Sequence, residues 1–117
     1  MRKGKGADVQ EDITEIVVLV TAASQEEAEH LGQKVIERKL AACLNVVRDI
    51  RSLFRWEGRV NVETECLLIF KSSRKCYQEL EQIIKENHSY SVPEVIALPI
   101  IAGSAPYLQW IRDETRK

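Results

Sequence analysis

Residues 40–71 read LAACLNVVRDIRSLFRWEGRVNVETECLLIFK and hold two long extended segments, 40–56 and 59–71, on either side of Glu57-Gly58. Gly58 supplies the positive φ that a tight hairpin turn requires. In the outer half of each segment apolar residues alternate with polar ones, which gives each strand one apolar face. The sequence therefore predicts a long antiparallel hairpin.

The same alternation predicts how the two strands pair. A two-residue turn would place Phe54 opposite Asn61, an apolar residue against a polar one. A three-residue loop would instead pair apolar side chains with one another and set Arg51 opposite Glu63 or Glu65. We therefore expect an odd-length loop, or a bulge beside the turn.

A strand and a helix are predicted before the hairpin. The β-branched run over residues 15–21 is too short for a helix and is typical of a strand in the middle of a sheet. Ser24 and Glu27 form a capping-box pattern, and apolar residues then recur at helical spacing until Lys39. A helix therefore follows the first strand.

Three more elements are predicted after the hairpin. Ser73 is expected to cap a helix that ends near residues 87–88. The almost wholly apolar run over 92–101 predicts a strand that is buried on both faces. Ser104, with Pro106 in the first turn, begins a short last helix.

The resulting order is β-α-β-β-α-β plus a terminal helix, which is typical of an α+β, ferredoxin-like fold with an antiparallel sheet and both main helices on one face. Hairpin strands of thirteen residues or more reach about 40 Å and overhang so small a domain. Their apolar outer half would exceed the apolar patch that a monomer tolerates. We therefore expect self-association through Ile50, Phe54, Trp56, Val60 and Val62.

Length and charge limit the class of protein. A chain of 117 residues suits one domain, assigned to residues 15–117, that needs neither disulfide nor structural metal to fold. Its net charge of -1, from 17 basic and 18 acidic residues, argues against a nucleic-acid binder. Residues 1–14 resemble a flexible tail, and no segment has the length and hydrophobicity of a membrane anchor.

Three cysteines, Cys43, Cys66 and Cys76, show neither a disulfide framework nor a zinc-ribbon spacing. A reducing cytoplasm suits such a chain best. The sequence also lacks a nucleophile-base pair at a known spacing, a phosphate-binding glycine loop and a zinc-protease motif. We therefore expect a protein without enzymatic activity.

Several blocks of sequence resemble the CutA divalent-cation tolerance family over about residues 15–112. They are LAACLN at 40–45, WEG at 56–58, Lys71, the run from His88 to Leu98, and YLQWI at 107–111. The resemblance implies a ferredoxin-like protomer, a homotrimer built by pairing the long hairpins between subunits, and a link to copper and other divalent metals. It implies no enzymatic reaction.

One block departs from the family pattern. Relatives usually have a proline where this chain has Ser89 and an acidic residue where it has Ser91. If that carboxylate assists metal or ligand binding in relatives, this chain must use Glu94 instead or bind more weakly. Loss of the proline is expected to loosen the turn by removing a fixed φ.

Cys43, His88 and Glu94 are the candidate metal ligands. Cys43 offers a soft sulfur suited to copper, and the resemblance places it in the second strand of a metal-linked protein. His88 offers an imidazole at a helix C-terminus, where the macrodipole favours the imidazolium and competes with metal. The alternatives are a small buried hydrophobe for Cys43 and a helix-ending histidine without a metal role. His30 is assigned to the surface.

A second group of residues suits a cleft between subunits, because a lysine and a carboxylate among aromatic walls fit a small anionic or zwitterionic ligand. The alternative is interface packing with an ion pair between Lys71 and Glu94. The group comprises Trp56, Lys71, Tyr90, Glu94, Tyr107 and Trp110.

Two functions follow. The first is a cytoplasmic homotrimer that contributes to divalent metal tolerance, copper above all, by binding metal ions. The alternative is a trimeric signalling or scaffold protein of the PII-like kind, which binds a small molecule or a protein partner at its inter-subunit clefts.

Overall fold

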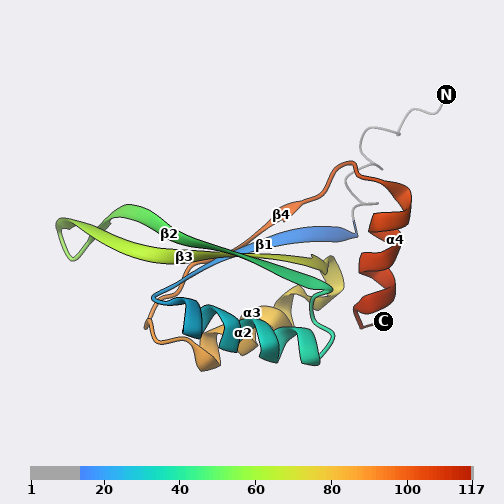
Figure 1. Ribbon diagram of the computed structural model, residues 1–117, viewed down its shortest axis with the longest axis horizontal. Coiled ribbons are helices and arrows are strands. Elements are labelled where there is room, and N and C mark those ends of the chain that lie inside the picture. Colours follow the sequence, from blue (N-terminus) through green and yellow to red (C-terminus); the bar gives the residue numbers. More distant parts are fainter. Residues whose placement is uncertain (1–13, 117) are drawn as a thin grey trace.

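The structure is a computed structural model that describes residues 14–116. Its strands form one antiparallel sheet in the order β2-β3-β1-β4, with bounds β1 Glu15–Ala22, β2 Cys43–Trp56, β3 Arg59–Ser73 and β4 Val95–Pro99. Helices α2 (Gln25–Glu37) and α3 (Tyr77–Asn87) cover one face, and α4 (Ala105–Glu114) lies at the end away from the hairpin tip (Figure 1). The predicted α+β fold is confirmed. The tail predicted at 1–14 falls, apart from Thr14, outside the described residues.

The hairpin turn has two residues, so the predicted odd-length loop is wrong. Trp56 pairs with Arg59, and Phe54 lies opposite Asn61. Glu57 has φ 53° and Gly58 has φ 77°, the pair of positive values that a type I′ turn needs. This turn matches the twist of the strands, which outweighs the mismatch of apolar and polar side chains that it creates.

A bulge does occur, but in the middle of β2 and not beside the turn. The register shifts between Val47 and Ile50, where Asp49 has φ 60°. Arg51 therefore lies opposite Thr64 and not opposite Glu63 or Glu65. Because side chains alternate along each strand, the outer hairpin has no single apolar face. Phe54 and Trp56 lie on one side of the ribbon, and Leu53, Val60 and Val62 lie on the other.

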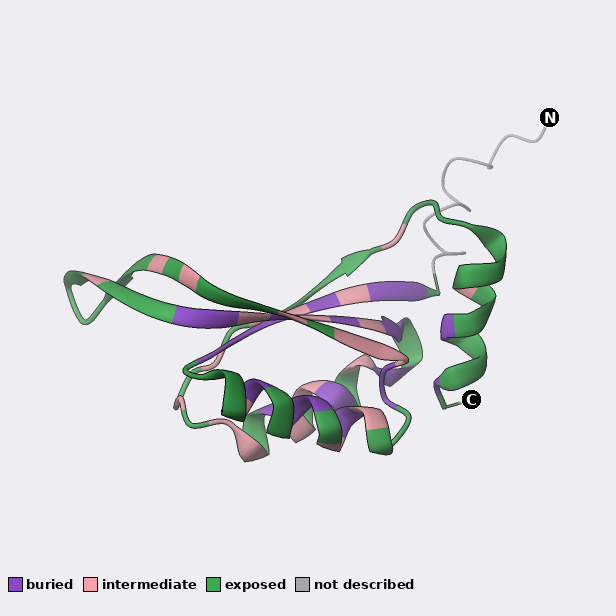
Figure 2. Cartoon of the chain, viewed as in Figure 1, coloured by how far each residue is buried: buried purple, intermediate pink, exposed green. Residues whose placement is uncertain are grey.

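The core lies between the sheet and the two helices α2 and α3 (Figure 2). Successive side chains of a strand point to opposite faces, so every second residue of β1 and β3 reaches this layer. Its fully buried residues include Val18, Val20, Leu68 and Phe70 from the sheet and Leu31, Val35, Leu80 and Ile84 from the helices. Among residues 14–116 no helix is long and apolar enough to span a membrane.

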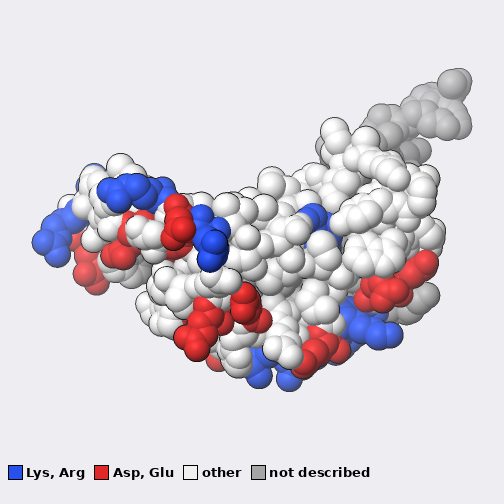
Figure 3. All heavy atoms as spheres, in the orientation of Figure 1, with Lys and Arg blue, Asp and Glu red and all other residues white. Residues whose placement is uncertain are grey.

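The other face of the sheet, called the open face below, is apolar and only partly covered. β4 is an edge strand, so the prediction of a strand buried on both faces is wrong. Val95 packs against the core, whereas Ile96 and Leu98 on the open face are 50% and 49% exposed. A broad and largely uncharged surface separates the charged hairpin tip from α4 (Figure 3). The apolar residues of the open face are Val17, Leu19, Cys43, Val47, Leu67, Ile69, Ile96 and Leu98, and Asn45 and Lys71 lie on the same face.

The two predicted caps behave differently. The Ser24 hydroxyl accepts a hydrogen bond of 3.1 Å from the Glu27 amide, which confirms the cap of α2. Ser73 opens a short 3₁₀ turn, Arg74–Cys76, but its side chain makes no cap bond. The Ser73 hydroxyl lies 2.5 Å from that of Thr115 and so ties the end of β3 to the chain after α4. The predicted cap at Ser73 is therefore wrong.

Candidate functional site

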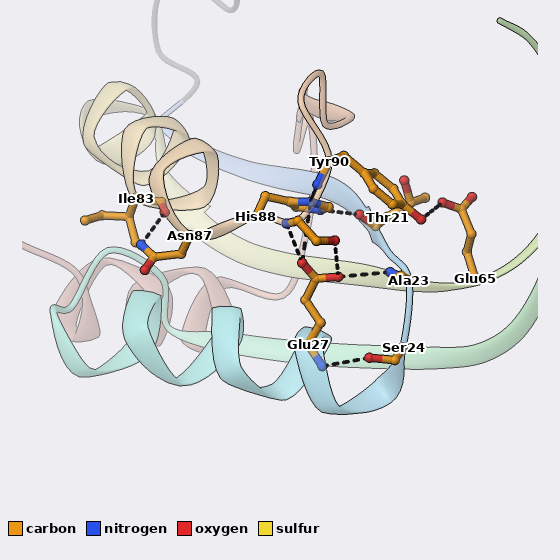
Figure 4. A network of polar contacts seen from close by, with 10 residues as sticks. Thr21, Ala23, Ser24, Glu27, Glu65, Ile83, Asn87, His88 and Tyr90 are labelled. Atoms are coloured by element: carbon orange, nitrogen blue, oxygen red, sulfur yellow. Dashed lines mark hydrogen bonds and ion pairs between the residues drawn. The ribbon is translucent and has the colours of Figure 1, made fainter.

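His88 follows α3, and its imidazole is completely enclosed. Its side chain is 0% exposed. Nε2 lies 2.7 Å from the carbonyl oxygen of Thr21, and Nδ1 lies 3.0 Å from the backbone nitrogen of Tyr90 (Figure 4). An amide can only donate, so Nδ1 accepts and Nε2 carries the hydrogen that is donated to Thr21. Neutral His88 thus uses both nitrogens within the protein and has neither free for a metal ion.

Glu27 anchors the segment after His88 to the start of α2. Its carboxylate accepts hydrogen bonds from the Ser89 amide at 2.7 Å, the Ser89 hydroxyl at 3.0 Å and the Ala23 amide at 3.1 Å. Burial alone would raise the pKa of Glu27, but the hydrogen bonds from Ser89 and Ala23 lower it. Ser89 therefore supplies an amide and a hydroxyl where a proline would supply neither, and the turn gains two hydrogen bonds in place of a fixed φ.

Glu27→Gln is expected to destabilise the fold in a pH-dependent way. Folding lowers the pKa of Glu27, so its charge stabilises the fold above the unfolded pKa of about 4.3, and this contribution is lost as pH falls through the lower folded pKa. We expect a loss of about 1–2 kcal/mol near neutral pH and none at strongly acid pH. Urea unfolding at several pH values measures the loss of stability at neutral and at acid pH. Glu26→Gln, on the exposed first turn of α2, is the control. A loss that does not change with pH would contradict this role.

Tyr90 lies against His88, with ring centroids 4.7 Å apart, and points its hydroxyl toward β3. The hydroxyl donates a hydrogen bond of 2.7 Å to Glu65 Oε2 (Figure 4). Burial, this bond and the charge of Glu65 raise the pKa of Tyr90. Burial and the charge of Glu65 also raise the pKa of Glu94. Tyr90 is thus a fixed hydrogen-bond donor, and a second carboxyl lies close enough to respond to Glu65.

A pocket of about 360 Å³ opens between the hairpin and the segment that carries Tyr90. We call it the Tyr90 pocket. Phe54 and Trp56 form an aromatic wall, since β2 places both on the same side of the ribbon. Residues 63–65 of β3 and 90–92 complete the lining together with Ala23. The pocket therefore combines aromatic and apolar walls with carboxylate groups.

A separate polar group lies at the other end of the open face, beside α4. Cys43 is the register partner of Lys71, and the Lys71 ammonium donates a hydrogen bond to Asn45. The Cys43 sulfur lies 3.9 Å from the hydroxyl of Tyr107, whose ring centroid is 5.5 Å from that of Trp110. Burial and the contact with Cys43 raise the pKa of Tyr107.

The sequence-based candidates thus fall into two places. Val17 pairs with Lys71, whereas the carbonyl four residues further along β1, at Thr21, bonds to His88, and four residues of strand span about 13 Å. Trp56 and Tyr90 share the Tyr90 pocket, whereas Lys71, Tyr107 and Trp110 lie near Cys43. Cys43 and His88 are not brought together within one chain, and residues 14–116 contain no cluster of three or more His, Cys, Asp or Glu residues suited to a metal ion.

Sequence reasoning missed Glu27, Asn45 and Glu65 as members of these groups. Glu27 was assigned only to a helix cap, and Glu65 only to the polar side of the hairpin. Glu27 binds Ser89 and Glu65 binds Tyr90, and both partners lie far away in sequence. No local spacing signals either contact.

Comparison with known proteins decides the family. A family model described as CutA1 divalent ion tolerance protein matches residues 16–114. The chain belongs to the CutA1 family. The resemblance in the sequence is therefore confirmed over nearly all of the described residues.

Relatives in the CutA1 family cover most of this chain. The chloroplastic CutA protein of Arabidopsis thaliana is 43% identical over 104 residues, which are 89% of this chain and 57% of that protein. The divalent-cation tolerance protein CutA of Thermus thermophilus is 41% identical over 101 residues, which are 86% of this chain and 98% of that protein. The crystal structure of CutA1 from Oryza sativa superposes with a TM-score of 0.87 at 44% identity and covers 90% and 96% of the two chains. The chain spans less than two thirds of the plant relatives' length.

Proposed function

We propose that this protein acts in tolerance of divalent cations, copper above all, as a homotrimer that binds its metal without catalysing a reaction. The observation that carries this proposal is membership of the CutA1 divalent ion tolerance family over residues 16–114. A relative from Thermus thermophilus bears the name divalent-cation tolerance protein.

The open face supports assembly into a homotrimer. It leaves large apolar side chains half exposed in the single chain, and both edge strands, β2 and β4, have backbone groups available for pairing. The hairpin adds apolar residues on both of its sides, since Leu53 and Val62 are exposed on one side and Phe54 and Trp56 on the other. Burial of these surfaces between copies is the driving force for assembly.

We propose Cys43 as the metal ligand of the protein. Its sulfur is the soft donor that copper favours, it is partly exposed on the open face, and it has no disulfide partner. The donors that complete the site come from other copies in the trimer, because residues 14–116 of a single chain contain no cluster of His, Cys, Asp or Glu around Cys43. The enclosed imidazole of His88 leaves it outside this proposed site.

A chelator-competition titration with Cu(I) under reductant, and with Cu(II), tests this proposal. Cys43→Ser is expected to weaken copper binding at least tenfold, about 1.4 kcal/mol, because the hydroxyl is a poor ligand for a soft ion. Cys76→Ala is the matched control, since it removes a buried sulfur elsewhere. Equal affinity in all three proteins, or no saturable binding, would contradict the metal function.

The Tyr90 pocket favours a second candidate function. A trimeric signalling or scaffold protein of the PII-like kind would hold a small molecule near the boundary between subunits, and a preformed pocket beside the hairpin suits that role.

We further propose that the protein works in the cytoplasm, where unpaired cysteines persist. Relatives bear the names of other compartments, chloroplastic in Arabidopsis and periplasmic in Archaeoglobus fulgidus, so cell fractionation is the check.

A further inference from the structure

Glu65 is a buried carboxylate that lacks a counter-ion within residues 14–116. The residue is only 7% exposed. Tyr90 donates a hydrogen bond to Oε2, but no lysine, arginine or histidine of the described chain forms an ion pair with either oxygen. Burying an ionised carboxylate is costly unless a positive charge accompanies it. The structure thus leaves one charge at the Tyr90 pocket unbalanced.

The surroundings of Glu65 add negative charge. Glu63 lines the same pocket, and Glu94 is near enough for the charge of Glu65, together with burial, to raise its pKa. Burial, Glu65, Glu27 and Glu63 all raise the pKa of Tyr90. The neighbouring charges that raise the pKa of Tyr90 and of Glu94 all belong to acidic residues. The pocket therefore attracts cations and repels anions.

The opposite wall of the pocket is aromatic. In the single chain Phe54 and Trp56 line it and remain 39% and 46% exposed, so that in an assembly they face both the pocket and a second copy. An aromatic face attracts an ammonium or guanidinium group, and tryptophan does so most strongly. A volume of about 360 Å³ lies within the range of small-molecule sites.

A bare metal ion fits these walls poorly. Hard divalent cations need about six oxygen ligands at short distance, and the described residues hold no cluster of that kind. Aromatic and apolar walls instead suit a cation that carries carbon. The lining thus selects an organic cation and not a metal ion.

We propose that the Tyr90 pocket binds an alkylammonium or guanidinium group, with Glu65 as its counter-ion and Phe54 and Trp56 around it. Tyr90 positions the carboxylate through its hydrogen bond. The inference rests on the second candidate function, whose ligand class it names. The group belongs either to a free small molecule or to a lysine or arginine of a second copy, and the outer half of the hairpin carries Arg51, Arg55 and Arg59.

The first experiment compares n-butylammonium, n-butylguanidinium and the neutral n-butanol by isothermal titration calorimetry and NMR shift mapping. Wild type is expected to bind at least one cation at least tenfold more tightly than butanol, with shifts at Trp56 and Tyr90. Glu65→Gln is expected to abolish that preference and Tyr90→Phe to reduce it. Glu86→Gln, on the exposed side of α3, is the matched control. Without ligand, Glu65→Gln is expected to raise the melting temperature, since it removes a buried charge.

The second experiment separates the two sources of the cation by sedimentation equilibrium at low and high salt. If a second copy supplies it, Glu65→Gln and one of Arg51→Ala, Arg55→Ala or Arg59→Ala weaken self-association at least tenfold. If a free molecule supplies the cation, Glu65→Gln loses cation binding but leaves self-association unchanged. Either result supports the proposal.

Two outcomes are decisive against it. In the first outcome, the wild type binds the cations and butanol equally, and Glu65→Gln changes neither this binding nor assembly. That outcome would overturn the cationic site, but it would leave a ligand pocket and the second candidate function standing. Absence of any binding, again with assembly unchanged in Glu65→Gln, would overturn both. The titration at Cys43 judges the metal function separately.

Discussion

Replacing Leu98 with aspartate is expected to convert the proposed trimer into monomers while each protomer stays folded. Leu98 is 49% exposed on the open face, so the protomer tolerates a charge there. In an assembly the same substitution loses about 0.8–1.5 kcal/mol of apolar burial in each copy, half the value for a fully exposed leucine, and buries an unpaired charge as well. We expect self-association to weaken by more than a hundredfold, about 2.7 kcal/mol, as measured by sedimentation equilibrium.

Two comparisons sharpen this experiment. Gln82→Asp places a charge on the exposed side of α3 and should leave assembly unchanged. Phe54→Asp and Val62→Asp test the two sides of the hairpin and should also dissociate the trimer. Where unfolding is reversible, the wild-type melting temperature should rise with protein concentration and that of Leu98→Asp should not. Trimer mass retained by Leu98→Asp would show that the open face is not the interface.

Replacing His88 with alanine is expected to lower the free energy of unfolding by about 3–5 kcal/mol. The substitution leaves a cavity, deprives the Thr21 carbonyl of its donor and deprives the Tyr90 amide of its acceptor. Buried polar groups without partners each cost about 1–3 kcal/mol. Urea unfolding measures the loss, first with a chelator present and then with Cu(II). We expect the same loss in both, because the imidazole acts through hydrogen bonds inside the protein.

His30→Ala, on the exposed surface of α2, is the control and should change stability by less than about 0.5 kcal/mol. A wild-type protein that Cu(II) stabilises, beside a His88→Ala protein that it does not, would identify His88 as a metal ligand after local rearrangement. That result would return His88 to the metal site beside Cys43.

The metal and cleft candidates show why site prediction from sequence stopped short. Cys43 and His88 have side chains that suit metal, and both lie next to ends of strands or helices. Yet His88 donates a hydrogen bond to Thr21 and accepts one from Tyr90, so neither nitrogen of its imidazole is free to bind a metal ion. Glu65, the buried carboxylate that has no ion pair within residues 14–116, has no distinguishing neighbour in sequence. Its significance depends on its burial and on Tyr90, and both arise only when the hairpin packs beside residues 88–94.

Local signals in the sequence are sufficient to predict the elements, their order and the family. β-branched runs, helical periodicity, the Ser24 cap and the positive φ at Gly58 act within a few residues of the chain. Tertiary structure alone decided the register of the hairpin, the bulge between Val47 and Ile50, the open face of β4 and the division of the candidate site into two places. These depend on which distant strands pair and which face they bury, and such long-range choices are made by packing and not by local preference.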